Sequence, residues 1–581
     1  MKWDEEVGLL VFGAGAAGMT AALVARCEGL GVVLCEKSSQ IGGTTATSGG
    51  TIWIPGNRLS LKSSNPDTIE AARTYMQAEI GPDHTLKREA FLASGAEAID
   101  YLERHSEVKL KVLDPYPDYH AELPGGAKGG RGLTPQAFDA RVLGKRFDTL
   151  RSPKPELMAL GGMMVPRDEI KFMIRPWRSL QAFKVATARV VRYALDRLRY
   201  RRGTRLVLGN ALVGRLYHSC LQKQVDIRLN HKLVELIKID GKVAGAVVES
   251  PGRRLAIRAR LGVVLATGGL AANRAWRDKL TGRAIPHTNA YDVASGDGVE
   301  AGLAAGAAFD KGRGTPFWWI PSSTIRWPDG RIATYPHIRD RPKPGLIAVN
   351  GKGQRFVNEA SSYHDFGLAQ LAPPPEDKAI PTWLICDRPF VHNYGLGVIH
   401  PVWQRVSFFE KIGYVISAST LDELARKIGV DPKALAASVE QNNRAAVTGT
   451  DEAFGKGSKA INRRDGDPEH KGPNMCIGPI AKAPFFAVPV YPAPIGSCAG
   501  LRTNGDSQVL DAQDQPIAGL YAAGNDMASV VDGTYPGPGA TLGPAIVFGY
   551  RAVMHAKQIS AAAGERSKDA RDVERTVASV T

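Results

Sequence analysis

The sequence predicts an α/β fold, and three observations support this prediction. A short apolar run at 7–12 is followed at once by a glycine-rich turn and an alanine-rich helical stretch, 19–28. A second apolar run, 32–35, ends in the acidic residue Glu36, and a third, 261–265, closes on small residues. Buried strands that alternate with helices in this way are typical of a Rossmann-like domain, in which helices cover a parallel sheet.

Length and composition place the chain among ordinary globular proteins. Its 581 residues exceed the size of one usual domain, and 44% hydrophobic with 23% charged residues exclude wholesale disorder and a fibrous structure. The six cysteines show neither a C-x-x-C pair nor the Cys/His spacing of a zinc site, so we expect reduced thiols and no metal. The net charge of +16 favours an anionic partner, either nucleic acid or lipid.

The glycine turn at 13–18 has the G-x-G-x-x-G pattern of a dinucleotide site. Gly13 permits the tight turn, Gly15 lets the backbone approach a pyrophosphate, and Gly18 lets the helix pack closely on the strand. The helix N-terminus attracts phosphate charge, and Glu36 is placed to hold a ribose hydroxyl. Strand, turn, helix and acid occur in the order that such a site requires.

The identity of the dinucleotide cofactor is indicated by three later segments, 42–50, 261–269 and 519–526. Together they resemble the FAD-binding segments of flavoprotein dehydrogenases of the fumarate reductase type, which implies non-covalent FAD in a domain of the glutathione reductase type. A second G-x-G-x-x-G is missing from the sequence, which argues against a nicotinamide site. The residues that we expect to contact FAD are Gly13, Gly15, Ala16, Ala17, Gly18, Glu36, Lys37, Gly42, Gly43, Thr44, Thr45, Ser48, Gly49, Gly50, Ala266, Thr267, Gly268, Asp297, Gly524, Asn525, Gly539, Thr541 and Leu542.

The FAD segments bracket a stretch without the fingerprint, and this sets the predicted domains. Residues 1–316 form the first part of the FAD-binding domain, and 496–560 form its second part. Between them, 317–495 forms an inserted α+β catalytic domain that covers the flavin, with the substrate at the junction. Residues 561–581 are polar and predict a solvated tail.

Three tyrosines point to a narrower family. The segments around Tyr119, Tyr363 and Tyr535 resemble those of the 3-ketosteroid Δ1-dehydrogenases, and the chain looks like a longer sterol-ketone member such as a cholest-4-en-3-one Δ1-dehydrogenase. The resemblance implies that Tyr363 is the base and Tyr119 its helper. It also implies that the Tyr535 hydroxyl and the Gly539 amide hold the substrate ketone.

The chemistry of a 4-en-3-one steroid needs such a set. Its hydrogens at carbon 2 are acidic, so desaturation proceeds by proton loss there and hydride loss from carbon 1 to flavin N5. Each donor to the developing oxyanion is worth about 3 to 4 kcal/mol. A tyrosine with a pKa of about 10 needs help as a base, and a hydrogen bond from Tyr119 to Tyr363 supplies it.

Two alternatives remain open. A 3-ketosteroid Δ4-(5α)-dehydrogenase is the nearer one, although its signature lacks the spacing between Tyr535 and Gly539. The other is a non-catalytic flavin-containing protein that binds steroid or lipid. A fumarate reductase is disfavoured because 495–500 lacks the histidine of the dicarboxylate site, and the apolar run 317–321 suits a large hydrophobic substrate. His120 and Cys498 have no partner constellation and are expected to serve packing.

A segment at about 141–205 looks inserted, and its second half predicts a basic amphipathic helix. Ten Arg and Lys residues between 175 and 205 face one acid, Asp196. The apolar side consists of Trp177, Leu180, Ala188, Val191, Leu195 and Leu198. Such a helix either lies on an anionic membrane or packs on the protein core, and periodicity cannot separate the two.

The remaining expectations concern partners and location. The substrate is a 3-ketosteroid or sterol ketone, and the electron acceptor is a carrier such as a quinone. A nucleic-acid partner is not expected, because no recognised binding motif accompanies the charge. No apolar stretch reaches the length of a spanning helix, and 1–6 carries acid where a signal peptide carries base. We therefore expect a cytoplasmic protein, peripheral on the membrane if the basic helix binds lipid.

Overall fold

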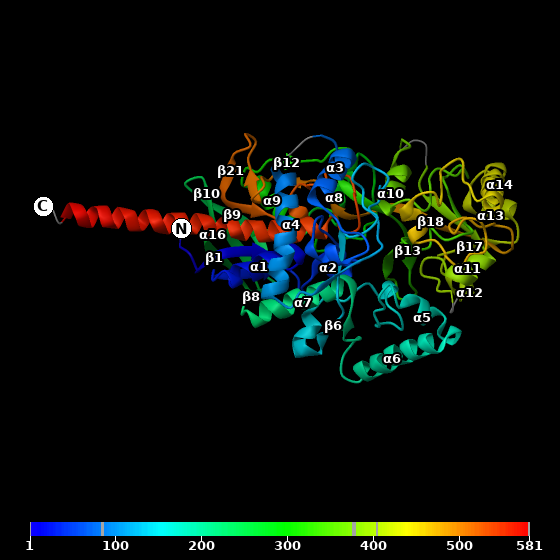
Figure 1. Ribbon diagram of the computed structural model, residues 1–581, viewed down its shortest axis with the longest axis horizontal. Helices are drawn as coiled ribbons and strands as arrows, with labels where there is room; N and C mark the ends of the chain where they lie inside the picture. Colours follow the sequence, from blue (N-terminus) through cyan, green and yellow to red (C-terminus); the bar gives the residue numbers. More distant parts are fainter. Residues whose placement is uncertain (1, 83–85, 375–378, 402–404, 579–581) are drawn as a thin grey trace.

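A computed structural model describes residues 2–82, 86–374, 379–401 and 405–578 of the chain. It contains two large sheets, which lie side by side in Figure 1, the first to the left and the second to the right. The first sheet has the strand order β20-β21-β11-β1-β2-β8, with β10 and β9 added at β11. The prediction of an α/β fold is confirmed.

The first sheet is built around β1 (Glu5–Phe12), whose second half is buried on both faces. Leu10 pairs with Val33 of β2 (Val32–Glu36) on one side and with Val263 of β11 (Arg253–Leu265) on the other, both in parallel register. The carboxyl ends of these strands therefore meet at one edge. The other strands are β8 (Asp226–Leu229), β9 (Lys232–Ile239), β10 (Lys242–Ser250), β20 (Gln508–Leu510) and β21 (Pro516–Ala522).

Three helices pack against one another beside this sheet. Helix α1 (Ala16–Cys27) begins directly after the glycine turn and contacts both α7 (Leu208–Gln222) and α16 (Leu542–Ala578). Helix α16 also contacts α4 (Leu86–His105), and its C-terminal part projects beyond the body of the molecule. The predicted tail thus continues α16 as far as Ala578, and 579–581 lie outside the described residues.

The second sheet has the order β14-β13-β18-β16-β15, with β17 paired to β18. Its longest strands are β13 (Phe317–Arg326) and β18 (Phe485–Ser497), which are antiparallel. The run 317–321 is buried in β13, and Trp318 within it also lines a cavity, so its suitability for a large hydrophobic substrate stays a prediction. The other members of this region are β14 (Ile332–Pro336), β15 (Leu346–Val349), α10 (Tyr363–Leu371), β16 (Thr382–Asp387), α11 (Arg388–Tyr394), α12 (Val406–Lys411), β17 (Ile416–Ala418), α13 (Leu421–Ile428), α14 (Pro432–Thr448) and α15 (Ala460–Arg464).

Shorter elements connect these layers. They are α2 (Gly43–Thr47), β3 (Ile52–Trp53), η1 (Arg58–Lys62), α3 (Ile69–Ile80), β4 (Leu110–Val112), β5 (Gly132–Pro135), α8 (Arg274–Thr281), α9 (Asp297–Ala304), β12 (Phe309–Asp310), β19 (Gly500–Leu501) and η6 (Gly524–Asp526). Strands β3, β4 and β5 form a small sheet of their own. Among the described residues, no helix combines the length and apolarity that crossing a membrane requires.

The predicted insertion is closed at its base by two short strands, because β6 (Phe138–Asp139) pairs with β7 (Arg205–Leu206). Between them lie η2 (Ala140–Thr149), η3 (Pro155–Leu157), α5 (Ile170–Ile174), η4 (Pro176–Arg178) and α6 (Leu180–Arg197). Helix α6 contacts α5 and η4 and lies at the lower edge of Figure 1.

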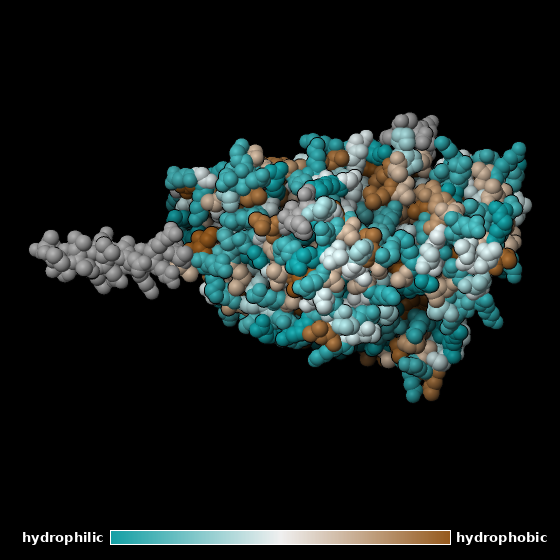
Figure 2. Space-filling model, turned by 45° about the horizontal axis from the view of Figure 1, so that its top comes forward, coloured by the Kyte–Doolittle hydropathy of each residue, from teal (hydrophilic) through white to brown (hydrophobic). Residues whose placement is uncertain are grey.

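The apolar side of this helix faces solvent. Trp177 is 72% exposed, Leu180 70%, Leu195 57% and Leu198 84%. In Figure 2, hydrophobic groups project at the lower edge of a face that is otherwise mostly hydrophilic. The alternative in which this side packs on the protein core is therefore wrong.

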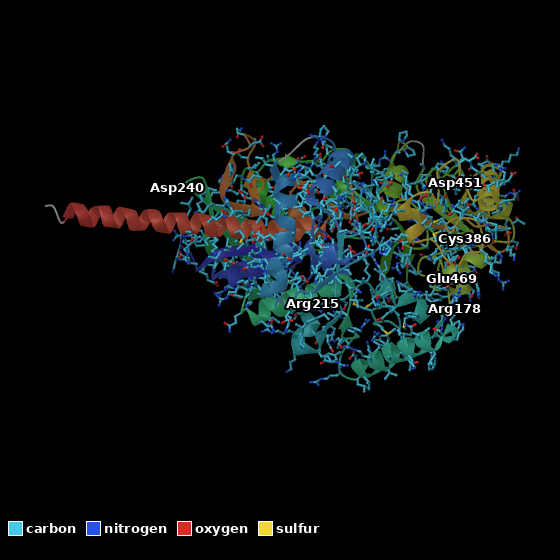
Figure 3. All side chains as sticks on the ribbon, viewed as in Figure 1. Arg178, Arg215, Asp240, Cys386, Asp451 and Glu469 are labelled. Carbon is cyan, nitrogen blue, oxygen red and sulfur yellow. The ribbon has the colours of Figure 1, made fainter. Side chains whose placement is uncertain are left out.

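The basic side is less charged than the sequence indicates. Arg189 and Arg205 both pair with Glu169, and Arg192 pairs with Asp139. Arg178 reaches Glu469 of the other domain, as Figure 3 shows. The exposed cations without a printed acidic partner in the described chain are Lys184, Arg197, Arg199 and Arg201. Asp196 is buried and accepts hydrogen bonds from Arg141 and Thr204, so it does not offset them.

Candidate active site

The glycine turn has the geometry that its sequence predicts. Gly13 has φ of 101°, and a Cβ there would lie 2.2 Å from the carbonyl oxygen of Ala266. A Cβ on Gly18 would lie 1.8 Å from the Gly13 oxygen, because the helix packs directly on the turn. Gly15 is different, since its nearest neighbour would be the Thr45 hydroxyl at 3.7 Å. The turn thus leaves open space at Gly15, where a pyrophosphate has to approach.

A cavity opens at the carboxyl ends of β1 and β2. It is lined by Phe12, Gly13, Cys35, Glu36, Lys37, His231, Leu233, Thr267, Val293 and Asp297. The Glu36 carboxylate accepts the amides of Ala14 and Ser38, each at 2.9 Å, and burial raises the pKa of this acid. Lys37 and Asp297 form an ion pair on the wall. An acid held at the end of the second strand fits a ribose, as predicted.

The polar side chains of the segment 42–50 form hydrogen bonds with backbone groups of the protein. The Thr45 hydroxyl accepts the amide of Ala16, and the Thr44 hydroxyl accepts the amide of Tyr291. The Ser48 hydroxyl donates to the Thr45 carbonyl and accepts the amide of Gly50. These side chains are internally bonded, so the surface available to a cofactor is backbone, including Gly43, around which a Cβ would meet nothing within 4 Å.

A second cavity lies between Trp318 of β13 and the segment 524–544. Its lining residues are Trp318, Gly524, Asn525, Met527, Ser529, Val530, Ala540, Thr541 and Pro544. Asp526 is fully buried and accepts hydrogen bonds from Thr267 and from the amide of Gly269, so it ties 266–269 to η6. Burial raises the pKa of Asp526 to about 6. From the sequence, either Asp526 or Asn525 could face the ribitol of FAD. In the structure Asn525 lines the cavity, whereas the carboxylate of Asp526 bonds Thr267 and Gly269.

The three predicted tyrosines meet in one cluster. The ring centres of Tyr119 and Tyr363 lie 5.5 Å apart, those of Tyr119 and Tyr535 5.5 Å, and those of Tyr363 and Tyr535 5.4 Å. Tyr363 is the first residue of α10, which Ser362 caps by accepting the Asp365 amide. The amide of Tyr119 donates to the carbonyl of Pro536, which fixes the Tyr119 segment against the Tyr535 segment.

The hydroxyls of this cluster form a chain. Burial raises the pKa of Tyr363, and its hydrogen bond from Tyr119 lowers it. Burial also raises the pKa of Tyr535 to about 12, while hydrogen bonds from Tyr363 and Thr541 lower it. Thr541, expected to contact FAD, therefore also serves Tyr535. Tyr363 thus accepts a hydrogen bond from Tyr119 and donates one to Tyr535, which raises the pKa of Tyr363, and its role as the proton acceptor stays a prediction.

Gly539 lies close to the tyrosine hydroxyls and has a φ of 95°. A Cβ at this position would lie only 2.3 Å from the Thr51 carbonyl oxygen. Its carbonyl accepts the Trp53 amide, but its own buried N–H has no printed acceptor among the described residues. Helix α16 begins three residues later at Leu542, and the amides of Gly543 and Ala545 already donate to the carbonyls of Gly539 and Thr541. A buried free N–H at a helix N-terminus is suited to a developing negative charge.

Two histidines near the cluster had no signal in the sequence. His364 accepts the Trp319 amide through Nδ1 and donates from Nε2 to the Gly533 carbonyl, and burial lowers its pKa to about 4. His120 instead bridges two acids, with Nδ1 2.9 Å from Glu79 and Nε2 3.0 Å from Asp365. It therefore joins the segment of Tyr119 to the helix of Tyr363. Cys498 donates to the Thr315 carbonyl in the core, as expected for a packing residue.

The two cavities and the free amide fit FAD. The adenosine end has a glycine turn with open space at Gly15 and an acid at the ribose position. The other end has a cavity lined by Asn525 and Thr541 that reaches the tyrosine cluster through Trp318, whose ring centre is 6.0 Å from that of Tyr535. Among the described residues, no group of His, Cys, Asp and Glu is arranged to hold a metal ion.

Comparison with known proteins identifies the family. The FAD binding domain family model matches residues 8–542. A 4-oxocyclohex-2-ene-1-carboxylate 5-dehydrogenase of Sinomonas cyclohexanicum is 37% identical over 95% of this chain and 94% of its own length. A 3-oxosteroid 1-dehydrogenase of Mycobacterium tuberculosis is 35% identical over 97% of this chain and all of its own length.

A solved structure agrees with these relatives. The 3-ketosteroid Δ1-dehydrogenase of Sterolibacterium denitrificans, in complex with 1,4-androstadiene-3,17-dione, superposes with a TM-score of 0.88 at 36% identity. The match covers 95% of this chain and 99% of that one. The chain therefore belongs to the FAD-binding flavoproteins and, within them, to the family of the 3-oxosteroid 1-dehydrogenases.

Proposed function

We propose that the protein catalyses the FAD-dependent 1,2-desaturation of 3-ketosteroids, converting a 4-en-3-one into a 1,4-dien-3-one. The observation that carries the proposal is the convergence of three tyrosine hydroxyls and a buried free amide in one site. The site adjoins a cavity that fits FAD. Relatives named for this reaction support it.

Each residue has a role that follows from its surroundings. The Tyr535 hydroxyl and the Gly539 N–H donate to the ketone oxygen and stabilise the charge that develops there. Tyr363 acts as the phenolate, takes the proton from carbon 2 and becomes a neutral phenol, and the hydrogen bond from Tyr119 stabilises the phenolate before the transfer. FAD, when bound, supplies the hydride acceptor for carbon 1 at its N5 atom. The neutral His364 holds α10 against β13 and thereby orients Tyr363.

The decisive experiment is anaerobic mixing of the purified flavoprotein with a 4-en-3-one steroid. We expect flavin bleaching and, with an artificial acceptor, a product two hydrogens lighter with a 1,4-diene. Bleaching only with a 5α-saturated ketosteroid would favour the Δ4-(5α)-dehydrogenase instead. If no ketosteroid bleaches the flavin, the remaining alternative is a non-catalytic protein that binds steroid or lipid.

A tyrosine variant separates catalysis from binding. Tyr363→Phe keeps the ring and removes the oxygen, so turnover should fall by at least about a thousandfold while flavin absorbance persists. The matched control is Tyr414→Phe, because Tyr414 is also buried but bonds Ser323 away from the cluster. Equal rates for the Tyr363→Phe protein and the control would remove Tyr363 as the base.

We further propose that the insertion rests on an anionic membrane surface. The support is an exposed apolar side, from Trp177 to Leu198, next to Lys184, Arg197 and Arg199. A helix of this kind buries its apolar side at the lipid interface while its cations meet the headgroups. A membrane position also brings the site close to lipophilic sterol ketones and to a quinone as electron acceptor.

Vesicle co-sedimentation tests this placement. The protein should bind vesicles containing anionic phosphatidylglycerol, less so at high salt, because salt screens the charge attraction. The double variant Trp177→Ser, Leu180→Ser should lose most of the binding, whereas Leu61→Ser, a control at an exposed leucine elsewhere, should keep it. Binding that survives in the double variant would contradict the placement.

Carboxylated single rings form a second candidate substrate class. Some relatives are named for oxocyclohexanecarboxylates and their cyclohexene analogues. The observation in this chain that favours the class is a group of arginines beside the tyrosine cluster.

A further inference from the structure

Two arginines from distant segments, Arg167 and Arg464, lie over the ring of Tyr116, and a third, Arg339, lies within electrostatic reach of both. The guanidinium carbon of Arg464 lies 3.4 Å from the centre of the Tyr116 ring, and that of Arg167 lies 5.6 Å from it. Burial lowers the pKa of the Arg339 guanidinium, and the charges of Arg167 and Arg464 lower it further, so the three groups share one electrostatic environment. We call these three residues the arginine cluster.

The arginine cluster is short of negative charge. Asp465 pairs with Arg464 at 2.6 Å, and its charge raises the pKa of Arg339, against the larger effects of burial and of Arg167. Arg167 and Arg339 make no printed ion pair or hydrogen bond with the described residues. Nη1 of Arg167 and Nε of Arg464 are buried without an acceptor. Guanidinium N–H groups that are buried without an acceptor are costly, and a planar anion within reach would offset that cost by accepting hydrogen bonds from them.

The arginine cluster adjoins the reacting groups. The Tyr116 ring lies 6.5 Å from that of Tyr119, and the Tyr116 hydroxyl acts electrostatically on Tyr363 and Tyr535. On the other side, Nη2 of Arg167 lies 3.0 Å from the position that a Cβ on Gly49 would take, within the segment expected to line the flavin. An anion bound here would belong to a molecule that also reaches the tyrosines.

We propose that the arginine cluster is a carboxylate subsite, and that the preferred substrate is a ring ketone that carries a carboxylate. This inference rests on the proposed function, since Tyr535 and Gly539 hold the ketone end of the same molecule. The carboxylate has two sources, a single cyclohexenone ring or a steroid whose side chain ends in an acid. Both would offer the same planar pair of oxygens to Arg167 and Arg339.

The first experiment compares acids with their uncharged esters. The substrates are 4-oxocyclohex-2-ene-1-carboxylate, a 4-en-3-one steroid with a carboxylated side chain, and the methyl ester of each. For at least one pair, kcat/KM of the acid should exceed that of the ester by about tenfold to a hundredfold, mainly through KM, as expected for charge-assisted hydrogen bonds. The pair that shows the difference identifies the source, and equal constants in both pairs would overturn the inference.

Variants then test the arginines. Arg339→Gln should reduce the acid-to-ester ratio at least tenfold, and Arg167→Gln gives an independent second case should one variant fold poorly. The matched control is Arg463→Gln, because Arg463 neighbours Arg464 but is exposed and bonds the Ser458 carbonyl. An unchanged ratio in both cluster variants would contradict the subsite.

A binding readout separates the two proposals. Non-reactive 4-hydroxybenzoate should perturb the flavin absorbance of the wild-type holoenzyme and bind at least tenfold more weakly to Arg339→Gln. If the protein turns over neutral ketosteroids and shows no preference for acids, the carboxylate subsite is contradicted and the proposed function still holds. Absence of bleaching with every ketone, acid or ester, would instead remove the proposed function.

Discussion

The two ends of the cofactor site are built in opposite ways. At the adenosine end, Gly13, Gly15, Gly18 and Glu36 lie within 24 consecutive residues and act through backbone geometry and one carboxylate. At the tyrosine end, Tyr119, Tyr363 and Tyr535 come from three distant segments and act through side-chain hydroxyls. The first end is made by one local turn, whereas the second exists only after three segments far apart in the sequence have folded against one another.

Because the two ends are built differently, substitutions should affect the reaction rate and the FAD affinity separately. A substitution at the tyrosine end should change rates and leave FAD bound, because the backbone cradle is elsewhere. A substitution at the adenosine end should change FAD affinity and leave the rate of the loaded enzyme nearly unchanged. The predictions below run from the largest expected effect to the smallest.

Tyr535→Phe should lower kcat/KM by about a hundredfold to a thousandfold, because it removes one donor to the developing oxyanion. The flavin content and absorbance should stay at the wild-type level. Steady-state kinetics beside a flavin spectrum measure both quantities. If the flavin were lost in this variant, the separation between the two ends would fail.

Tyr119→Phe should have a smaller effect that depends on pH. Its hydroxyl lowers the pKa of Tyr363, so its loss raises that pKa and shifts the rise of kcat/KM towards higher pH. A shift of one to two pH units corresponds to a loss of about tenfold to a hundredfold at neutral pH. A uniform loss at all pH values would mean that Tyr119 only fills space.

Glu36→Ala should weaken FAD binding by about tenfold, through loss of a charge-assisted hydrogen bond to the ribose. Repeated ultrafiltration of the holoenzyme measures the FAD released, and kcat is measured with FAD in excess. Glu36→Gln should have an intermediate effect, since it keeps the shape and one acceptor oxygen but turns an NH₂ group towards the amide of Ala14 or Ser38. A lower kcat at saturating FAD would show that the adenosine end also affects chemistry.

His120→Gln should lower the free energy of unfolding by about 1 kcal/mol at pH 6, because it removes the bridge to Glu79 and Asp365. Burial lowers the pKa of His120, but the hydrogen bonds to Asp365 and Glu79 raise it to about 10 overall, above the unfolded value of about 6.5. The stabilisation is therefore present in full below about pH 6.5 and is lost as the pH rises through about 10.

Urea unfolding of both proteins at pH 6 and pH 10.5 checks this expectation. The difference between wild type and variant should shrink at the higher pH. A difference that stays constant would mean that His120 contributes by packing rather than by charge.

The adenosine end of the site could be predicted from local sequence, whereas the tyrosine end could not. The turn at 13–18 was predicted from the residues alone, because backbone constraints on glycine are local. The roles of the tyrosines required family resemblance, since no spacing indicates that Tyr119 and Tyr363, 244 residues apart, will touch. The role of the run 317–321 in binding a hydrophobic substrate stays a prediction, because a buried strand and an apolar pocket have the same composition.

Other features depended on tertiary structure that no local pattern carries. His120 finds its two acids only when α3 and α10 meet, and the arginine cluster combines residues from the insertion, from the loop after β14 and from α15. Exposure of the apolar side of α6 could not be predicted either. Periodicity gives the side of a helix but not what covers it.

The base of the insertion, where β6 and β7 bring its two ends together, has an evolutionary consequence. A segment whose ends are already paired can be gained, lost or exchanged as a cassette while the scaffold around it stays in register. In this chain the cassette carries both Arg167 and the exposed side of α6. A single recombination event at this point would therefore exchange Arg167 and the exposed side of α6 together.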